Sequence, residues 1–289
     1  MPILYVVWAL ALLSVIALGL FSTSNVSYRL SVAGLDSARL DAMTNAAVNR
    51  AVLALLDNRA DKRWRSDGVP VAFDFNGTRM SVSVQDETGL IDLNHADGSI
   101  LSRLLQSAGL DDAAAEKLTE KILDWRDDNP FKRINGAKAQ DYSAAGLSYV
   151  PRNGPFQAVD ELNFVMDMTH SLFRRIRPAI TVYSGRSQFD PQIAPYQALL
   201  AMSGMDEGKA KEVIANRTKS GNALDSLGMG LGASMLGRSF TIRIETAAAH
   251  TQFVQNTTIR ITNSLSELYW ILNVERPDVT VARGPNPPR

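Results

Sequence analysis

The sequence lacks cysteine, contains only three histidines and has no net charge. Without cysteine, the chain forms no disulfide, no thiolate metal site and no cysteine nucleophile. The histidines, His95, His170 and His250, are far apart, and none belongs to the HExxH pair of a zinc hydrolase. Lys and Arg together number 30, as do Asp and Glu, so no global positive charge favours nucleic acid or anionic lipid.

The start of the chain has no charged residue at all. Residues 3–21 read ILYVVWALALLSVIALGLF. Because about 20 apolar residues in a helix cross a bilayer core, we expect a transmembrane helix over residues 1–22. A cleaved secretory signal is the alternative, but such signals begin with basic residues and have a shorter apolar core. Residues 22–60 contain no proline and have apolar residues at helical spacing, which predicts one continuous helix to about Asp57.

Two groups of strands are predicted, on either side of a helical region. Residues 69–93 alternate apolar and polar side chains around Asn76-Gly77, a pair typical of tight hairpin turns. The same alternation returns within residues 239–276, where Phe240, Ile242 and Ile244 lie at period two. We expect both groups to form one small antiparallel sheet.

The region between them, residues 94–238, has helical periodicity. We expect helices over 99–109, 111–128 and 169–176, another opening at 158–162, and a loop over 133–157. A weak internal repeat relates LLQSAGLDDAAAEKLTEKILDWR to LLAMSGMDEGKAKEVIANR. In each copy an apolar helix is followed by Gly-apolar-Asp, an Ala- and Lys-rich helix and an Arg.

These elements predict an α+β protein whose long N-terminal helix packs on the sheet. Residues 1–22 form the transmembrane part, and residues 23–93 the amphipathic helix and hairpin. An all-α domain of two helix-hairpin-helix-like halves, residues 94–238, is inserted into the sheet. Residues 239–276 supply the final strands, and residues 277–289, which end in GPNPPR, form a disordered tail.

This organisation resembles the K-type minor pseudopilins of the type II secretion system. The resemblance depends on Gly89–Asn94, Ile122–Asp127, Phe156, Asp160–Leu162 and the 204–217 block. Within these segments, the α-domain motif consists of Asn94, Trp125, Asp160, Glu161 and Leu162. The resemblance implies a non-catalytic subunit that caps a periplasmic pseudopilus and supports protein export. It also implies a single pass through the bacterial inner membrane, with the head in the periplasm.

The resemblance further implies specific partners. These are the I- and J-type minor pseudopilins, the major pseudopilin and the inner-membrane assembly platform. Contact with secreted substrate or with the secretin is also implied. No nucleic acid is expected as a partner. The apolar start would then be an assembly stem, whose residues are Ile3, Leu4, Val6, Val7, Trp8, Leu10 and Leu12. Most pilins carry a glutamate near the position of Val6, whereas no acid precedes Asp36 here. A stem without a buried carboxylate needs no partner above it, which suits a tip subunit. If Pro2 matches the first residue of the family's mature chain, the basic leader is absent from this sequence.

A group of acids in the helical region suggests a metal site. Asp124, Asp127, Asp128 and Asp141 flank a loop, and calcium prefers such oxygen ligands. The family is associated with calcium here, but Lys138 and Ala139 replace two acids of its pattern. The alternative is that Asp127 and Asp128 cap and solvate a helix end, with Trp125 in the core. An acid–base pair for glycoside hydrolysis is a third reading, which no pocket signal supports.

A membrane-anchored DNA-binding protein remains the alternative function. The segment LAMSGMDEGKAKEVIANR is similar to a helix-hairpin-helix, a module whose backbone amides bind phosphates. However, Asp206 in Gly204-Met205-Asp206 places an anion where a phosphate would lie, and Gly109-Leu110-Asp111-Asp112 does the same. Zero net charge also leaves little counterion release to favour DNA binding.

Overall fold

The structure is a computed structural model of the chain and has two compact units, Met1–Asn49 and Arg50–Arg289. It describes residues 2–57, 59, 62–75, 77–220, 235–248, 251–264 and 266–276, without the side chains of 15–37, 218–220, 247–248 and 251–252. The predicted tail, 277–289, and His250 lie outside the described residues. The other predicted domain boundaries, which divide the chain into residues 1–22, 23–93, 94–238 and 239–276, remain predictions.

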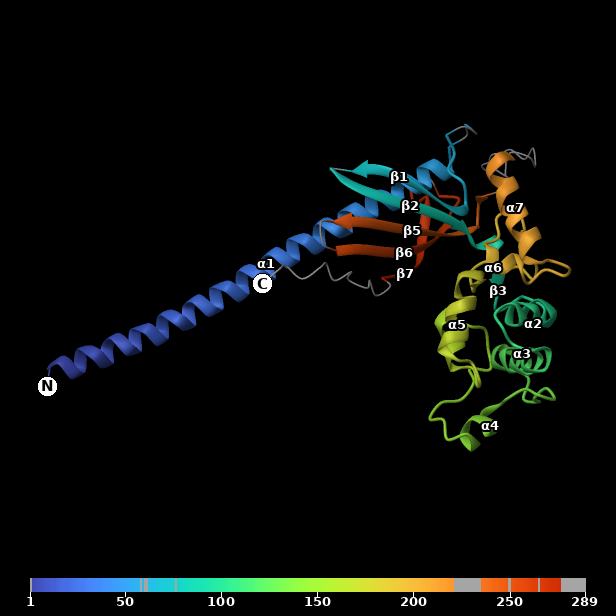
Figure 1. Cartoon of the computed structure of the whole chain (residues 1–289), viewed down its shortest axis with the longest axis horizontal. Coiled ribbons are helices and arrows are strands. Elements are labelled where there is room, and N and C mark those ends of the chain that lie inside the picture. The colour runs from blue at the N-terminus through green and yellow to red at the C-terminus, as the bar shows by residue number, and fades with distance from the viewer. Residues whose placement is uncertain are drawn as a thin grey trace. The chain divides into compact units, whose positions relative to one another are not determined.

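The first element is one long helix, α1 (Pro2–Leu55), shown in blue in Figure 1. It confirms the continuous helix predicted to about Asp57. Proline is tolerated at Pro2 because the first turn of a helix has no partner for that backbone N–H. Within the described part of the chain, no helix is both long enough and apolar enough to cross a membrane. The side chains of residues 15–22 in the predicted span lie outside that part.

A five-stranded antiparallel sheet contains the predicted hairpin and the predicted final strands. Ile91 and Asp92, expected in the same sheet, pair instead in parallel with residues 180–181 in a separate two-stranded sheet. Its strands are β1 (Asp67–Phe75), β2 (Thr78–Asp86), β5 (Ser239–Ala248), β6 (Thr251–Ile261) and β7 (Tyr269–Glu275), adjacent in that order. All neighbouring pairs are antiparallel. Gly77, with φ of +76°, supplies the left-handed conformation expected of the β1–β2 turn. Asn76 lies outside the described residues.

The two faces of the sheet differ in character, as the alternating pattern predicts. Val82 pairs with Ile244 and Val84 with Ile242, and all four are buried on one face. Ser83 and Arg243, which alternate with these residues, pair on the opposite face. The sheet therefore has one apolar face and one polar face.

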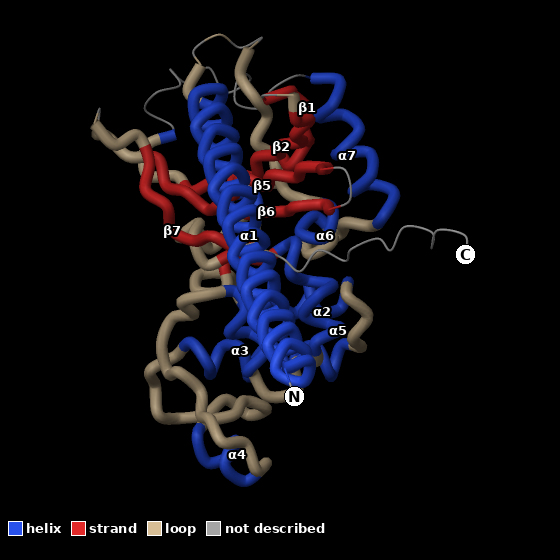
Figure 2. The backbone as a smooth tube through the Cα atoms, turned by 90° about the vertical axis from the view of Figure 1, so that its left-hand side faces the viewer, coloured by secondary structure: helices blue, strands red, loops and turns tan. Residues whose placement is uncertain are grey.

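In the part of the chain that the structure describes, the other elements lie in sequence between the adjacent strands β2 and β5. They are η1 (Glu87–Gly89), β3 (Ile91–Asp92), α2 (Gly98–Ser107), α3 (Asp112–Arg126), α4 (Ala139–Ala144), η2 (Val159–Phe164), α5 (His170–Ile176), η3 (Arg177–Ala179), β4 (Ile180–Thr181), α6 (Tyr196–Leu199) and α7 (Glu207–Ser220). Strands β3 and β4 pair in parallel. Figures 1 and 2 show α2, α3 and α5 grouped together, with α4 farthest from the sheet.

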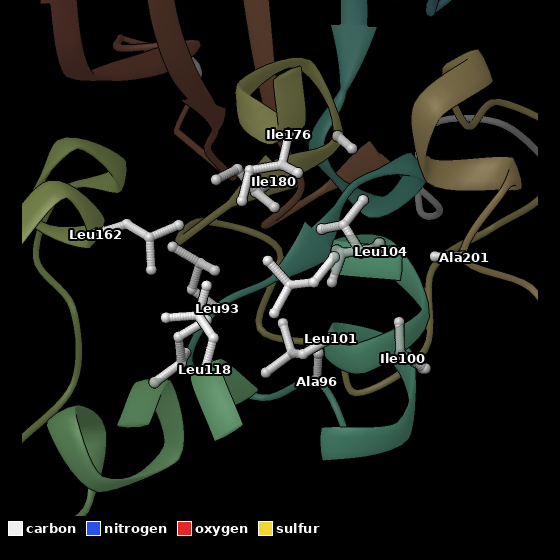
Figure 3. Packing of buried hydrophobic residues seen from close by; sticks show 14 of the residues in the cluster. Leu93, Ala96, Ile100, Leu101, Leu104, Leu118, Leu162, Ile176, Ile180 and Ala201 are labelled. Atoms are coloured by element: carbon white, nitrogen blue, oxygen red, sulfur yellow. The ribbon is translucent and has the colours of Figure 1, made fainter. Parts of the chain in front are cut away.

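The helical region has its own apolar core, drawn in Figure 3. Leu101, Leu104, Leu118 and Leu162 are buried there, together with residues from α5 and α6. Two predictions for this region were wrong in detail. Residues 133–157 contain the short helix α4, and residues 158–162 lead into the 3-10 helix η2 rather than an α-helix.

The internal repeat is visible in the backbone. Gly109 precedes α3 and Gly204 precedes α7, with φ of +104° and +72°, and each is followed two residues later by a capping Asp. The carboxylate of Asp111 accepts from the N–H of Ala114, and that of Asp206 accepts from the N–H of Lys209, both at 2.8 Å. The weak sequence similarity therefore corresponds to the same turn and the same N-cap.

An arginine closes each copy of the repeat in the same way. Arg126, at the end of α3, donates to the carbonyls of Leu93 and Ala96 at 2.6 and 2.9 Å. Arg217, in α7, donates to the carbonyls of Pro191 and Ala194. In both copies the carbonyls are three residues apart and immediately precede the first helix. The arginines thus tie the second helix of each pair to the chain entering the first.

Candidate metal site, domain junction and exposed surfaces

Asp124, the central residue of the predicted metal site, lies on α3 and its side chain is fully buried. Arg133 binds it twice: Nη1 donates to Oδ1 at 2.5 Å, and the backbone N–H donates to Oδ2 at 3.1 Å. Gly136 packs directly against this carboxylate, since an added Cβ would lie 1.8 Å from Oδ2. Asp124 therefore faces cationic and backbone groups of its own chain.

The other predicted ligands also have internal partners or point to solvent. Asp127 accepts from Arg133 Nη2 at 3.1 Å, and Asp141 accepts from Lys132 Nζ at 2.5 Å. The pKa of Asp127 is lowered by hydrogen bonds from the Asn129 backbone and then from Arg133. The pKa of Asp141 is lowered chiefly by the hydrogen bond from Lys132. Asp128 is exposed.

Lys138 extends its ammonium group into the space that the acids surround. Its Nζ donates to the carbonyls of Asp124 and Asp127, both at 2.8 Å, and approaches Asn153 Oδ1 at 3.3 Å. An ammonium has three donors, so these three oxygens use them all. The carbonyl of Asp124 belongs to the last turn of α3, where it has no partner within the helix.

This set of donors does not fit calcium. Calcium takes 6–8 oxygens, whereas here the charges of Asp124, Asp127 and Asp141 are already balanced by Lys132, Arg133 and Lys138. Among the described residues, no three Asp, Glu or His side chains converge closely enough to hold a metal ion. The observed contacts instead resemble the alternative interpretation, in which Asp127 solvates the end of the helix and Trp125 lies in the core.

The α-domain motif is structural in this geometry. Asn94 hydrogen-bonds to both backbone groups of Phe156, donating at 2.9 Å and accepting at 2.7 Å. The ring of Phe156 stacks on Trp125, with centroids 6.0 Å apart. Leu162 is fully buried in the same core. These contacts hold the long loop after α3 against the helices.

The two acids of the motif bind arginines. The carboxylate of Glu161 accepts hydrogen bonds from Nε and Nη2 of Arg152, at 2.8 and 2.9 Å. Asp160 is exposed and lies 4.0 Å from Arg177 Nε. Neither acid joins Asp124 in a common cluster. The motif therefore holds the loop in place rather than supplying metal ligands.

A cavity of about 300 Å³ lies where the helical region meets the polar face of the sheet. Its lining includes Ser83 and Thr258 from the sheet, and Tyr183 just after β4. Glu87, in η1, is buried beside it and accepts hydrogen bonds from Thr181 Oγ1 and, at 2.6 Å, from Thr241 Oγ1. Burial raises the pKa of Glu87 to about 7.

No local pattern indicates that Glu87 occupies a buried site. In the sequence, Asp86-Glu87-Thr88-Gly89 reads as a break after a strand. The two threonines that bind Glu87 lie far along the chain and meet it only because β2 pairs with β5 and β3 with β4.

An ion pair crosses the same junction. Arg177, in η3, donates Nη2 to both carboxylate oxygens of Glu275 in β7, at 2.9 and 2.8 Å. About a third of each side chain is exposed, so solvent weakens the pair. Arg177 and Glu87 nevertheless attach the helical region to two different strands.

Among the described residues, apolar side chains are exposed on the predicted stem and on strand β7. All seven predicted stem residues are exposed, with fractions from 57% for Val7 to 79% for Ile3. The edge strand β7 exposes Trp270 and Ile271 by about half, at 55% and 54%, and Val274 by 47%. Apolar groups at a sheet edge are typical of interaction sites.

The hairpins that favoured DNA binding are occupied by the chain's own acids. Asp111 and Asp206 accept from the helix N–H groups that would otherwise bind a phosphate. The geometry therefore gives no support to the DNA-binding alternative.

Comparison with known proteins gives consistent results for this chain. Residues 80–185 match the family model described as type II secretion system (T2SS), protein K. The type II secretion system protein K of Klebsiella pneumoniae is 24% identical over 246 residues, covering 76% of this chain and 75% of that protein. The protein of the same name from Dickeya chrysanthemi is 28% identical over 138 residues, covering 45% of this chain and 38% of that protein.

A solved structure has a similar fold. The chain matches the crystal structure of the GspK-GspI-GspJ complex from the enterotoxigenic Escherichia coli type 2 secretion system with a TM-score of 0.60 and 14% identity. The match covers 86% of this chain and 99% of that one.

Proposed function

We propose that the chain is a K-type minor pseudopilin of the type II secretion system and that it caps the tip of the periplasmic pseudopilus as a non-catalytic subunit. The observation that carries this proposal is the chain segment between β2 and β5. The two strands pair with each other, and the helical region that connects them gives the subunit a bulky head. Such bulk is hard to repeat along a helical filament but is tolerated at its end.

The proposal includes an inserted α-domain of residues 94–238. Its support is the separate apolar core of α2, α3, α5 and α6, and the repeated helix pairs closed by Arg126 and Arg217. The Arg177–Glu275 pair and the buried Glu87 would fix this domain to the sheet. A fixed domain presents the same surface to partners or secreted substrate at the tip.

The stem of α1 is proposed to anchor the subunit in the inner membrane before assembly, with the head in the periplasm. Exposed apolar side chains on every side of a helix require lipid or other apolar helices around them. Val6 and its neighbours carry no charge, so the stem can leave lipid and pack among other stems without a buried carboxylate.

The expected partners are I- and J-type minor pseudopilins, since the solved structure with a similar fold is a complex of GspK with GspI and GspJ. On this chain, the exposed edge strand β7 is the surface we propose for one of them. Trp270 and Ile271 provide an apolar anchor, and β7, an edge strand among the described residues, can accept a further strand.

A complementation experiment tests this function. A strain that lacks its K protein should secrete normally with the full chain but lose secretion with Trp270→Glu. Ile134→Glu is the matched control, because Ile134 is 93% exposed but lies in the loop after α3. Equal secretion by the Trp270→Glu and Ile134→Glu strains would refute the β7 surface. Normal secretion and pseudopilus length after deletion of residues 94–238 would refute the role of the α-domain.

A further inference from the structure

The loop between α3 and η2 is anchored by cations that belong to the chain itself. We propose that the ammonium of Lys138 and the guanidinium of Arg133 take the place of calcium in this loop, so that the helical region folds without a divalent metal. The proposal rests on the contacts of these two side chains and does not depend on the function proposed above.

Lys138 joins three separate parts of the chain. Its Nζ contacts the last turn of α3 through the carbonyl of Asp124, the residue after the helix through the carbonyl of Asp127, and the far end of the loop through Asn153. Asn153 has a φ of +51°, a conformation that asparagine adopts more readily than most residues. A positive charge among oxygens at the C-terminus of a helix is also favoured by the helix dipole.

Arg133 joins two carboxylates that would otherwise repel each other. Nη1 binds Asp124 and Nη2 binds Asp127, while the backbone N–H of Arg133 takes the second oxygen of Asp124. One guanidinium thus neutralises the buried end of the site and positions the loop backbone. Bridging carboxylates and ordering a loop is what a bound calcium ion does in other proteins.

A calcium ion would have no advantage in this arrangement. Calcium must approach its oxygens to about 2.3–2.6 Å, and the carbonyls of Asp124 and Asp127 are already engaged by Lys138 at 2.8 Å. A divalent ion on these oxygens would be adjacent to an ammonium and a guanidinium, which repel it. It could enter only by displacing Lys138.

The experiment measures thermal unfolding of the full chain in detergent, with excess EDTA or with millimolar calcium chloride. We expect Tm values equal within about 1 °C for the wild-type chain, because a ligand that does not bind the folded state does not stabilise it. Lys138→Met should lower Tm by roughly 4–8 °C in both solutions. It should also accelerate proteolysis within residues 127–154.

Lys132→Met is the matched control, since Lys132 makes one partly exposed ion pair with Asp141. It should change Tm by less than about 2 °C. A calcium-dependent rise in the wild-type Tm, or heat of calcium binding by the wild-type chain in calorimetry, would overturn the proposal. Equal Tm values for Lys138→Met and Lys132→Met would also overturn it. The wild-type calorimetry decides the question even if Lys138→Met does not fold.

Discussion

The sharpest structural prediction concerns Gly136→Ala. The added Cβ would lie 1.8 Å from Oδ2 and 2.7 Å from Cγ of the buried Asp124, and ordinary contact requires about 3.5 Å. The carboxylate would have to move by more than 1 Å, which breaks its bonds from the guanidinium and the backbone N–H of Arg133. No positive φ is involved at Gly136, so the expected effect comes from the lost space alone.

The magnitude follows from the exposure of the two partners. Breaking a fully buried ion pair costs about 3–5 kcal/mol, but Arg133 is 35% exposed, so we expect about 2–3 kcal/mol. For a unit of this size, that corresponds to a fall in Tm of roughly 5–10 °C.

Differential scanning fluorimetry of the full chain measures this fall. Gly154→Ala is the matched control, because the nearest atom to its added Cβ is Arg152 Cγ at 3.9 Å. Its Tm should stay within about 2 °C of wild type. If Gly136→Ala and Gly154→Ala unfold at the same temperature, the packing proposed around Asp124 is incorrect.

Three further predictions test other parts of the molecule. Since burial raises the pKa of Glu87 from 4.5 to about 7, the folded state retains a proton that the unfolded state releases, and wild-type stability falls between those pH values. Glu87→Gln should remove that fall, so that its free energy of unfolding in urea exceeds that of the wild type by up to roughly 3 kcal/mol at pH 8 but not at pH 4. An equal difference between variant and wild type at both pH values would contradict this prediction. Asn94→Ala should cost about 2–3 kcal/mol because it leaves both backbone groups of Phe156 unpaired, while Asn163→Ala, which loses one exposed bond, should cost under about 1 kcal/mol. Lys138→Glu should lower Tm in EDTA and recover part of the loss in calcium; no recovery would show that the site is not shaped for a cation.

The sequence predicted the elements of the fold well because their patterns are local. Alternation marked β1, β2, β5 and β6, and glycine followed by an apolar residue and aspartate marked the two hairpins before α3 and α7. The sequence predicted an α-helix at the η2 segment because Ala158–Leu162 contains helix-forming residues. The run is short, so packing rather than propensity determines its conformation, and it forms a 3-10 helix.

The sites could be predicted only in part, because they depend on long-range contacts. The sequence showed that Lys138 would disfavour calcium, but not that its ammonium reaches the end of α3. Glu87 carried no local signal, because Thr181 and Thr241 approach it through strand pairing between distant segments. Likewise, only the strand order shows that β7 is an edge and that Trp270 is exposed there.

The proposed position at the tip of the pseudopilus is tested most directly by locating the chain on assembled filaments. Filaments sheared from cells that produce an epitope-tagged version of the full chain can be labelled with gold-conjugated antibody and imaged by electron microscopy. We predict gold at one end of each filament and none along its length. Gold distributed regularly along the filaments would contradict the capping role.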